Sequence, residues 1–213
     1  LDSLPEPLRS AVRDGDFGAG RQDDEWQVVP TEWIVAAQGR WREDGNRGMA
    51  MTAMALDPAG GGTDSAELAW RYGAWFAPLA SEQGKSTADP TGMMGKILMH
   101  RRDDAPVIVD VGGGYSGAIV TRLRDNSIRD VGFNGAAEAR GRALGSKLPF
   151  ANKRAECWYR FREALDPDQD GGSIIALPPD PELRADLSAP RLNPRALEVR
   201  GEILIESKDD LRK

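Results

Sequence analysis

Two aspartates each close a short apolar run and precede a glycine-rich turn. Asp57 follows the run 53–56, and Asp110 follows the run 107–109. Each aspartate is followed within three residues by three consecutive glycines. Carboxylates held at the ends of buried strands are suited to a divalent cation, because hard cations such as Mg²⁺ take oxygen ligands in a fixed geometry. The pattern therefore predicts a metal site that acts on phosphate groups.

Asp64 is a third candidate ligand for the same site. It lies seven residues beyond Asp57, after a flexible glycine turn that allows the chain to fold back towards the other two carboxylates. A purely structural role is the alternative. In that case Asp57 and Asp64 bond the amides of their own turn, and Asp110 caps the helix that follows it.

Strand and helix patterns supply the frame for these side chains. Short apolar runs and alternation predict strands, and a spacing of three or four residues predicts helices. The predicted strands cover 49–56, 67–72, 75–80, 107–111, 128–133 and 173–177, and a hairpin is predicted at 197–207 with its turn near Gly201. The predicted helices cover 91–102, 116–125, 152–165 and a short segment after Asp180-Pro181. Three strands that lead into alternating helices and strands predict a mixed α/β fold.

Residues 1–48 differ in character from the rest of the chain. They contain three prolines, an acidic stretch from Asp14 to Glu25, and three tryptophans. Trp33 and Trp41 lie at helical spacing after Thr31, which is a suitable cap. Because exposed indole rings are costly, we expect this arm to pack on another part of the protein. The predicted organisation is an arm or linker at 1–48 and a domain at 49–213.

The charge of the chain is acidic on average and basic in one segment. A net charge of −6 argues against tight nonspecific binding of nucleic acid by the chain alone, since such binding depends on Lys and Arg. Between Arg140 and Arg162, however, seven basic residues accompany the single acid Glu156. The predicted DNA contacts are Arg140, Arg142, Lys147, Lys153 and Arg154. An ordinary solvated surface is the alternative reading of this charge.

The single cysteine and the single histidine restrict the possible chemistry. One thiol, Cys157, excludes a disulfide framework and a cysteine-rich zinc site, and we expect it to be buried in a helix. His100 precedes two arginines at the expected end of a helix, where a cation complements the helix dipole. A histidine-dependent catalytic triad is therefore not favoured.

The glycines after Asp110 also permit other readings. Gly112, Gly114 and Gly117 match the dinucleotide-binding pattern, and 109–112 resembles the first motif of Rossmann-like methyltransferases. Both readings require an acid at the tip of the next strand, but that strand ends at Phe133-Asn134. The paired aspartates and glycines also resemble the phosphate loops of actin-like ATPases, which are much longer proteins. A methyltransferase remains a less favoured alternative.

A series of motifs, taken in order, resembles the nuclease domain of the large terminase subunit of tailed bacteriophages. The motifs are Leu4-Pro-Glu-Pro-Leu-Arg9 with Gly15-Asp-Phe17, Trp26-Gln-Val-Val-Pro30 with Trp33, Leu56-Asp-Pro-Ala-Gly-Gly-Gly-Thr-Asp64, Val109-Asp110, Phe133-Asn-Gly135, Phe150-Ala-Asn-Lys-Arg-Ala-Glu156 with Trp158, and Ile205-Glu-Ser-Lys-Asp209. The resemblance runs almost from end to end. It implies a ribonuclease-H-like fold, with a mixed sheet and helices on both faces.

The resemblance also implies a site that binds two divalent ions, Mg²⁺ or Mn²⁺. By motif match, Asp57 is the catalytic metal ligand on the first strand and Asp110 the one on the fourth, and Asp64 matches an auxiliary acid. In such sites one ion lowers the pKa of the attacking water and the other stabilises the leaving oxygen. The family's third principal carboxylate is expected beyond Lys213, so we expect the site within this sequence to be incomplete.

The expected function is that of a metal-dependent endonuclease that cuts duplex DNA during viral genome packaging. The expected partners are double-stranded DNA, an ATPase domain upstream of Leu1, the small terminase subunit and the portal protein. The expected location is the cytoplasm of the host cell, with no membrane partner. The alternative from another class is a noncatalytic module that docks on the motor or contacts DNA through the tryptophan arm and the basic segment.

Overall fold

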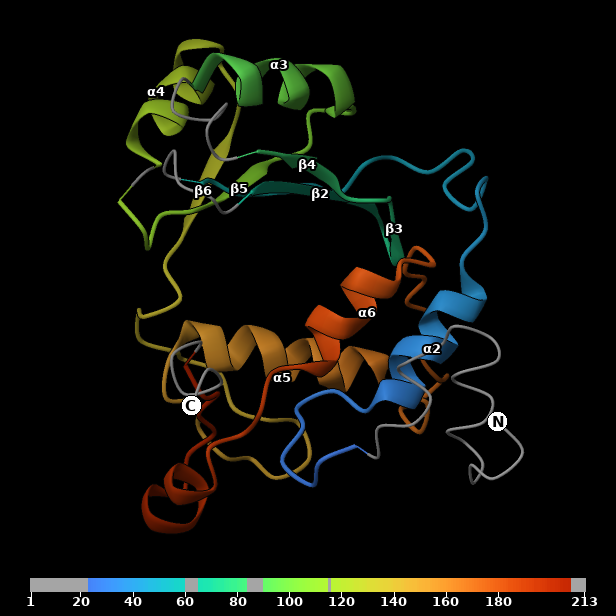
Figure 1. Cartoon of the computed structure of the whole chain (residues 1–213), viewed down its shortest axis with the longest axis vertical. Helices are drawn as coiled ribbons and strands as arrows, with labels where there is room; N and C mark the ends of the chain where they lie inside the picture. The colour runs from blue at the N-terminus through green and yellow to red at the C-terminus, as the bar shows by residue number, and fades with distance from the viewer. Residues whose placement is uncertain (1–22, 60–64, 84–89, 115, 208–213) are drawn as a thin grey trace, which may run out of the picture.

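A computed structural model describes residues 23–59, 65–83, 90–114 and 116–207 (Figure 1). A sheet lies between two groups of helices. One group is α3 (Pro90–His100) and α4 (Gly117–Asp125); the other is α2 (Thr31–Arg40), α5 (Lys153–Leu165) and α6 (Pro181–Ser188). The predicted mixed sheet with helices on both faces is confirmed. None of the described helices has the length and apolar character needed to cross a lipid bilayer.

In the described part of the chain the sheet has six strands, in the order β3-β2-β1-β5-β6, with β4 also paired to β2. The strands are β1 (Ala53–Asp57), β2 (Ala66–Tyr72), β3 (Trp75–Phe76), β4 (Ala80–Glu82), β5 (Val107–Asp110) and β6 (Asp130–Phe133). β1 pairs antiparallel with β2 and parallel with β5, and β5 pairs parallel with β6. Rossmann-like enzymes have largely parallel sheets, so this arrangement argues against the methyltransferase alternative.

Alternating apolar side chains fix one face of the sheet against α3 and α4. Met54 and Leu56 of β1 and Val107 and Val109 of β5 are buried, whereas the residues between them are only partly buried. Together with side chains of α3 and α4 they form one apolar cluster, which we call the sheet cluster. Its buried members are Met51, Met54, Leu56, Ala66, Leu68, Met93, Met94, Ile97, Ala105, Val107, Val109, Ile119, Leu123 and Ile128.

A second apolar cluster, which we call the helical cluster, holds the other layer together. Its buried members are Val28, Val29, Ile34, Ala37, Ala143, Phe150, Ala155, Leu165, Leu177, Ile203 and Ile205. The arm packs here as expected: Trp33 lies against this cluster, with the Arg162 guanidinium 5.2 Å from the centre of its ring. The boundary at residue 48 stays a prediction, although residues on both sides of it share the cluster.

Two strand predictions were wrong in detail. The run 75–80 is divided into β3 and β4, with Pro78 between them, and proline cannot donate a hydrogen bond to a neighbouring strand. The run 173–177 is not a strand, because Ala176 makes only an isolated bridge to Trp75. β3 and β4 still belong to the sheet, where both pair with β2, whereas 173–177 lies outside it.

The predicted hairpin at 197–207 was also wrong. Residues Ala196–Arg200 form a single π-helical turn, η2, and Gly201 ends it with φ of 62°. A glycine in this left-handed conformation caps a helix as readily as it forms a hairpin turn. The residues beyond it run extended, with bridges from Ile203 to Phe150 and from Ile205 to Leu192.

Cys157 is exposed on α5, so the expectation of a buried thiol was wrong. Its pKa is nevertheless raised above the usual value, first by desolvation from nearby atoms and then by the charge of Glu156, with Lys153 acting in the opposite direction. The helical pattern predicted α5 correctly, but the thiol lies outside the stripe that faces the helical cluster.

Candidate active site

Asp57 and Asp110 are the last residues of two neighbouring parallel strands. Leu56 of β1 is in register with Val109 of β5, and each aspartate is the next residue along its strand. Parallel strands end at the same edge of a sheet, so both aspartates lie at that edge. Leu56 and Val109 point towards α3 and α4, and successive side chains alternate between faces. The two aspartates therefore share the opposite face, which Figure 1 shows turned towards α5.

Glu67 adds a third carboxylate to this face and was missed by the sequence analysis. It is the antiparallel partner of Asp57, with buried Ala66 and Leu68 on either side. The Ser81 hydroxyl donates a hydrogen bond of 2.6 Å to Glu67 Oε2. The alternation of apolar and polar residues along β2 indicates that Glu67 lies on the face away from the apolar side chains, but only the β1–β2 register reveals that Glu67 lies beside Asp57.

Asp110 also has a structural interaction. Its Oδ1 accepts a hydrogen bond of 2.8 Å from the Gly112 amide. A Cβ on residue 112 would lie 3.2 Å from that oxygen, so glycine permits the close turn. Asp110 does not cap α4, which begins after Ser116 without a side-chain cap. The turn bond fixes one carboxylate oxygen of Asp110 at the edge of the sheet.

The described part of the site supplies oxygen ligands but no complete metal cage. Within 23–59, 65–83, 90–114 and 116–207, no group of three or more His, Cys, Asp or Glu side chains is arranged to hold a metal ion. Asp64 lies outside the described residues, so its predicted return to the site has no observed position. The donor chemistry still fits the predicted cation, since carboxylate oxygens suit Mg²⁺ and Mn²⁺.

The five predicted DNA contacts fall into two groups. Arg140, Arg142 and Lys147 are exposed in the segment before α5, where Arg142 Nη1 donates to the Lys147 carbonyl at 3.0 Å. Lys153 and Arg154 begin α5 and have partners within the protein. Lys153 Nζ lies 2.7 Å from Glu156 Oε2.

Arg154 is held by both its side chain and its backbone. Its Nη1 donates to the carbonyl oxygens of Glu206 at 2.8 Å and Ile205 at 3.3 Å, and burial lowers its pKa. Its backbone amide donates to the Gly135 carbonyl, just beyond β6. Arg154 therefore links the start of α5 to the extended segment at 203–206.

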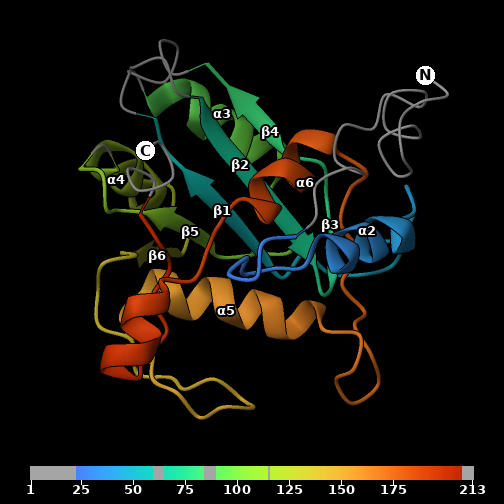
Figure 2. The same cartoon turned by 60° about the horizontal axis from the view of Figure 1, so that its bottom comes forward.

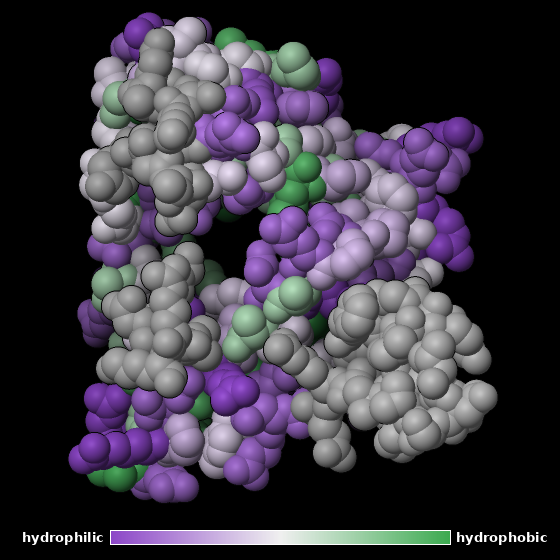
Figure 3. All heavy atoms as spheres, in the orientation of Figure 1, coloured by the Kyte–Doolittle hydropathy of each residue, from purple (hydrophilic) through white to green (hydrophobic). Residues whose placement is uncertain are grey.

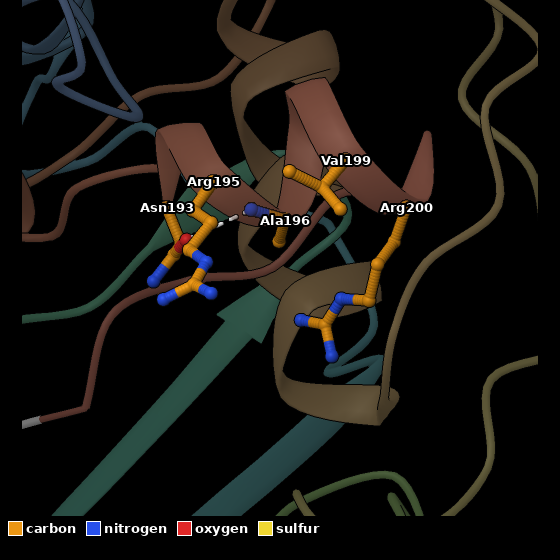
Figure 4. A pocket seen from close by; sticks show the side chains of 5 residues that line it. All are labelled: Asn193, Arg195, Ala196, Val199 and Arg200. Carbon is orange, nitrogen blue, oxygen red and sulfur yellow. Dashed lines mark hydrogen bonds between the residues drawn. The ribbon is translucent and has the colours of Figure 1, made fainter.

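A hollow lies between the two layers on the face drawn in Figure 3. A separate shallow pocket of about 380 Å³ lies on η2, beyond α5 from the sheet (Figure 1), and Figure 4 shows its lining by Asn193, Arg195, Ala196, Val199 and Arg200. Arg200 Nε pairs with Glu202 at 2.9 Å. The lining residues come from η2 and the residues just before it, and none is among the predicted site residues.

Comparison with solved structures identifies the architecture. No protein-family model and no curated protein sequence matches the chain. The nuclease domain of the large terminase subunit gp2 of bacterial virus Sf6 matches with a TM-score of 0.63 and 18% identity, over 87% of this chain and 90% of that one. The chain has the fold of a phage terminase nuclease domain. The predicted ribonuclease-H-like fold class is thereby confirmed.

Two further solved structures share this terminase nuclease fold. A mutant gp2 domain of Sf6 with calcium matches with a TM-score of 0.63 and 17% identity, over 87% of this chain and 90% of that one. A mutant of the same domain with manganese and beta-thujaplicinol gives the same values. Those terminase nuclease domains were thus solved with divalent cations.

Proposed function

We propose that this protein is a divalent-metal-dependent DNA endonuclease of a phage packaging motor, and that Asp57 and Asp110 bind the metal. The observation that carries the proposal is the register of Leu56 with Val109, from which the two aspartates follow as neighbours on one face. The fold shared with terminase nuclease domains supports the class of reaction. The solved domains with manganese or calcium support a divalent cation.

In this proposal Asp57 and Asp110 hold Mg²⁺ or Mn²⁺ through carboxylate oxygens, with Asp64 as an auxiliary ligand. Two ions, when bound, activate a water and stabilise the leaving oxygen of the phosphodiester. The Gly112 amide orients the Asp110 carboxylate by its bond to Oδ1. Glu67, beside Asp57, adds negative charge that favours a cation at this face.

Duplex DNA is the proposed substrate. The aspartates face the space between the sheet and the α5 layer, and the exposed side chains of Arg140, Arg142 and Lys147 supply positive charge in the α5 layer. Lys153 and Arg154 are proposed as weaker contacts, because each already has a protein partner. The proposed partners also include a packaging ATPase domain, the small terminase subunit and the portal protein, in the cytoplasm of the host cell.

A plasmid-nicking assay tests the proposal. Supercoiled DNA is incubated with the protein and Mn²⁺ or Mg²⁺, and the parent is compared with Asp57→Ala and Asp110→Ala. Asp125→Ala is the matched control, because Asp125 is exposed at the far end of α4. We expect weak, metal-dependent cutting by the parent and the control, since the described residues supply no complete metal cage, and its loss in both site variants.

Metal-dependent cutting that survives both substitutions would overturn the assignment of these aspartates. DNA binding without cutting, in either metal, would instead favour the noncatalytic module. The two outcomes are distinguished by measuring binding and cleavage on the same samples.

A further inference from the structure

The sheet layer and the α5 layer have separate apolar cores. The sheet cluster and the helical cluster share no buried member. A third, small cluster lies between them, with Trp75, Ala77 and Ala176 buried and with Trp41, Trp70 and Tyr72 packed around them. At this end of the sheet the contact between the layers is made by few side chains, and most of these are aromatic. A second connection lies just beyond β6, where the backbone amides of Arg154 and Lys153 in α5 donate to the Gly135 and Ala137 carbonyls.

The centre of this third cluster is a stacked pair of tryptophans. The rings of Trp41, which directly follows α2, and Trp75, which begins β3, lie 5.5 Å apart at an angle of 20°. Each indole also donates one hydrogen bond of 2.9 Å across the contact: Trp41 Nε1 to the Phe76 carbonyl, and Trp75 Nε1 to the Arg42 carbonyl. Stacking and two reciprocal bonds fix the end of α2 on β3, and Figures 1 and 2 both show these elements side by side.

A second segment holds β3 next to this stack. The Phe76 amide donates to the Ala176 carbonyl at 2.9 Å, and the Ala176 amide donates to the Ala74 carbonyl at 3.0 Å. The next residue, Leu177, donates to the Ala37 carbonyl in α2. Three segments that are distant in sequence thus meet at β3.

This contact and the aspartates lie at opposite ends of the sheet. β3 pairs with Arg71 and Tyr72 of β2, and Arg71 pairs with Ala53, the first residue of β1. Asp57 is the last residue of β1, about 13 Å away at the usual rise per residue of a strand. A tilt of about 10° at the contact would move the far end of the sheet by about 2 Å.

We propose that Trp41 and Trp75 form an aromatic clamp that sets the separation between the sheet and the α5 layer, and with it the width of the space in front of Asp57 and Asp110. A displacement of α2 then changes that width at a distance from the aspartates. The clamp itself is a property of the fold. Only its effect on DNA cleavage rests on the proposed function.

Distance measurement between the layers tests the clamp directly. Cys157 is the only cysteine in the sequence, is exposed, and lies on α5; Ala118→Cys adds a second thiol at an exposed residue near the start of α4, the helix that follows Asp110. Spin labels on both thiols report the spacing of the layers by double electron–electron resonance, in the full chain. We expect a single narrow distribution in the otherwise unchanged protein.

Two variants disturb the clamp by different routes. Trp41→Ala removes the stack and one hydrogen bond. Gly45→Ala keeps Trp41 but adds a methyl group 2.5 Å from Trp75 Cδ1, so the indole has to move. We expect either change to shift the mean distance by about 2 Å or to broaden the distribution by as much, because a tilt of about 10° at the clamp moves the far end of the sheet by that amount.

Two matched controls remove or add the same groups away from the clamp. Trp33→Ala deletes an indole from α2 itself, where Trp33 packs against the helical cluster and, among the described residues, is not part of the clamp contact. Gly39→Ala adds a methyl group with no atom within 4 Å. Distributions that stay unchanged in the clamp variants, or that change equally in the controls, would overturn the proposal.

Cleavage of plasmid DNA by the same proteins separates the two proposals. If the parent does not cut but the clamp variants still shift the distance, the clamp stands and the endonuclease proposal fails. If the parent cuts and the variants shift the distance without changing the rate of cutting, the clamp does not control the site and that part of the inference is overturned.

Discussion

Replacing Arg154 distinguishes a structural cation from a phosphate contact. The guanidinium bonds two carbonyl groups, at 2.8 Å and 3.3 Å, and it is only partly enclosed. A hydrogen bond from a charged donor contributes about 1.5–3 kcal/mol. The longer bond and the access of water reduce the total, so we expect Arg154→Ala to lower the free energy of unfolding by about 2 kcal/mol.

Arg142 is the matched comparison in the same basic segment. It is exposed and, among the described residues, bonds the Lys147 carbonyl of its own loop. We expect Arg142→Ala to change the free energy of unfolding by less than about 0.5 kcal/mol. Urea denaturation followed by tryptophan fluorescence measures both values.

The salt dependence of DNA binding gives an independent measure. Loss of one phosphate contact lowers the slope of log K against log salt by about 1. We expect that change for Arg142→Ala and a smaller one for Arg154→Ala, measured where both proteins are folded. The reasoning is refuted if Arg154→Ala has the same free energy of unfolding as the parent and lowers the slope of log K against log salt by a full unit.

Three further predictions concern the α5 layer. Ile34→Ala, at a fully buried position, should lower the free energy of unfolding by about 2–5 kcal/mol in urea denaturation. Asn152→Ala should lower the free energy of unfolding by about 1 kcal/mol, because the Asn152 side chain caps α5 by accepting a hydrogen bond from the Ala155 amide. Asn152→Asp should keep most of the stability, since aspartate is also a good cap. The rate of alkylation of Cys157 should rise with pH, with a midpoint above that of a free thiol because the pKa of Cys157 is raised. Glu156→Gln should lower that midpoint, since the charge of Glu156 contributes to the raised pKa. A midpoint at the usual thiol value would contradict the argument.

Strands and helices with strong patterns could be predicted from sequence. β5, α4 and α5 lie within one residue of their expected bounds, and β1 begins four residues later than expected, because apolar side chains at regular spacing decide both burial and element type. The pairing of Asp57 with Asp110 as candidate ligands also came from sequence, since each closes such a run. Their roles as metal ligands stay a prediction.

Features that depend on contacts between distant segments could not be predicted. Glu67 is one polar residue in an alternating strand, and only its register with Asp57 makes it part of the acidic face. Arg154 resembles its basic neighbours in sequence, yet its acceptors lie some fifty positions away. Gly201 matched a hairpin turn, but packing of the preceding residues as η2 made it a helix cap.

The two apolar clusters differ in how the chain assembles them. Every buried member of the sheet cluster falls between Met51 and Ile128, whereas the helical cluster requires both Val28 and Ile205. During synthesis the sheet layer can collapse while the ribosome still holds the later residues, but the helical layer must wait until nearly the whole sequence has emerged. Until then Val28 and Ile34 stay unburied, which makes this interval the stage at which the nascent protein is most exposed to aggregation.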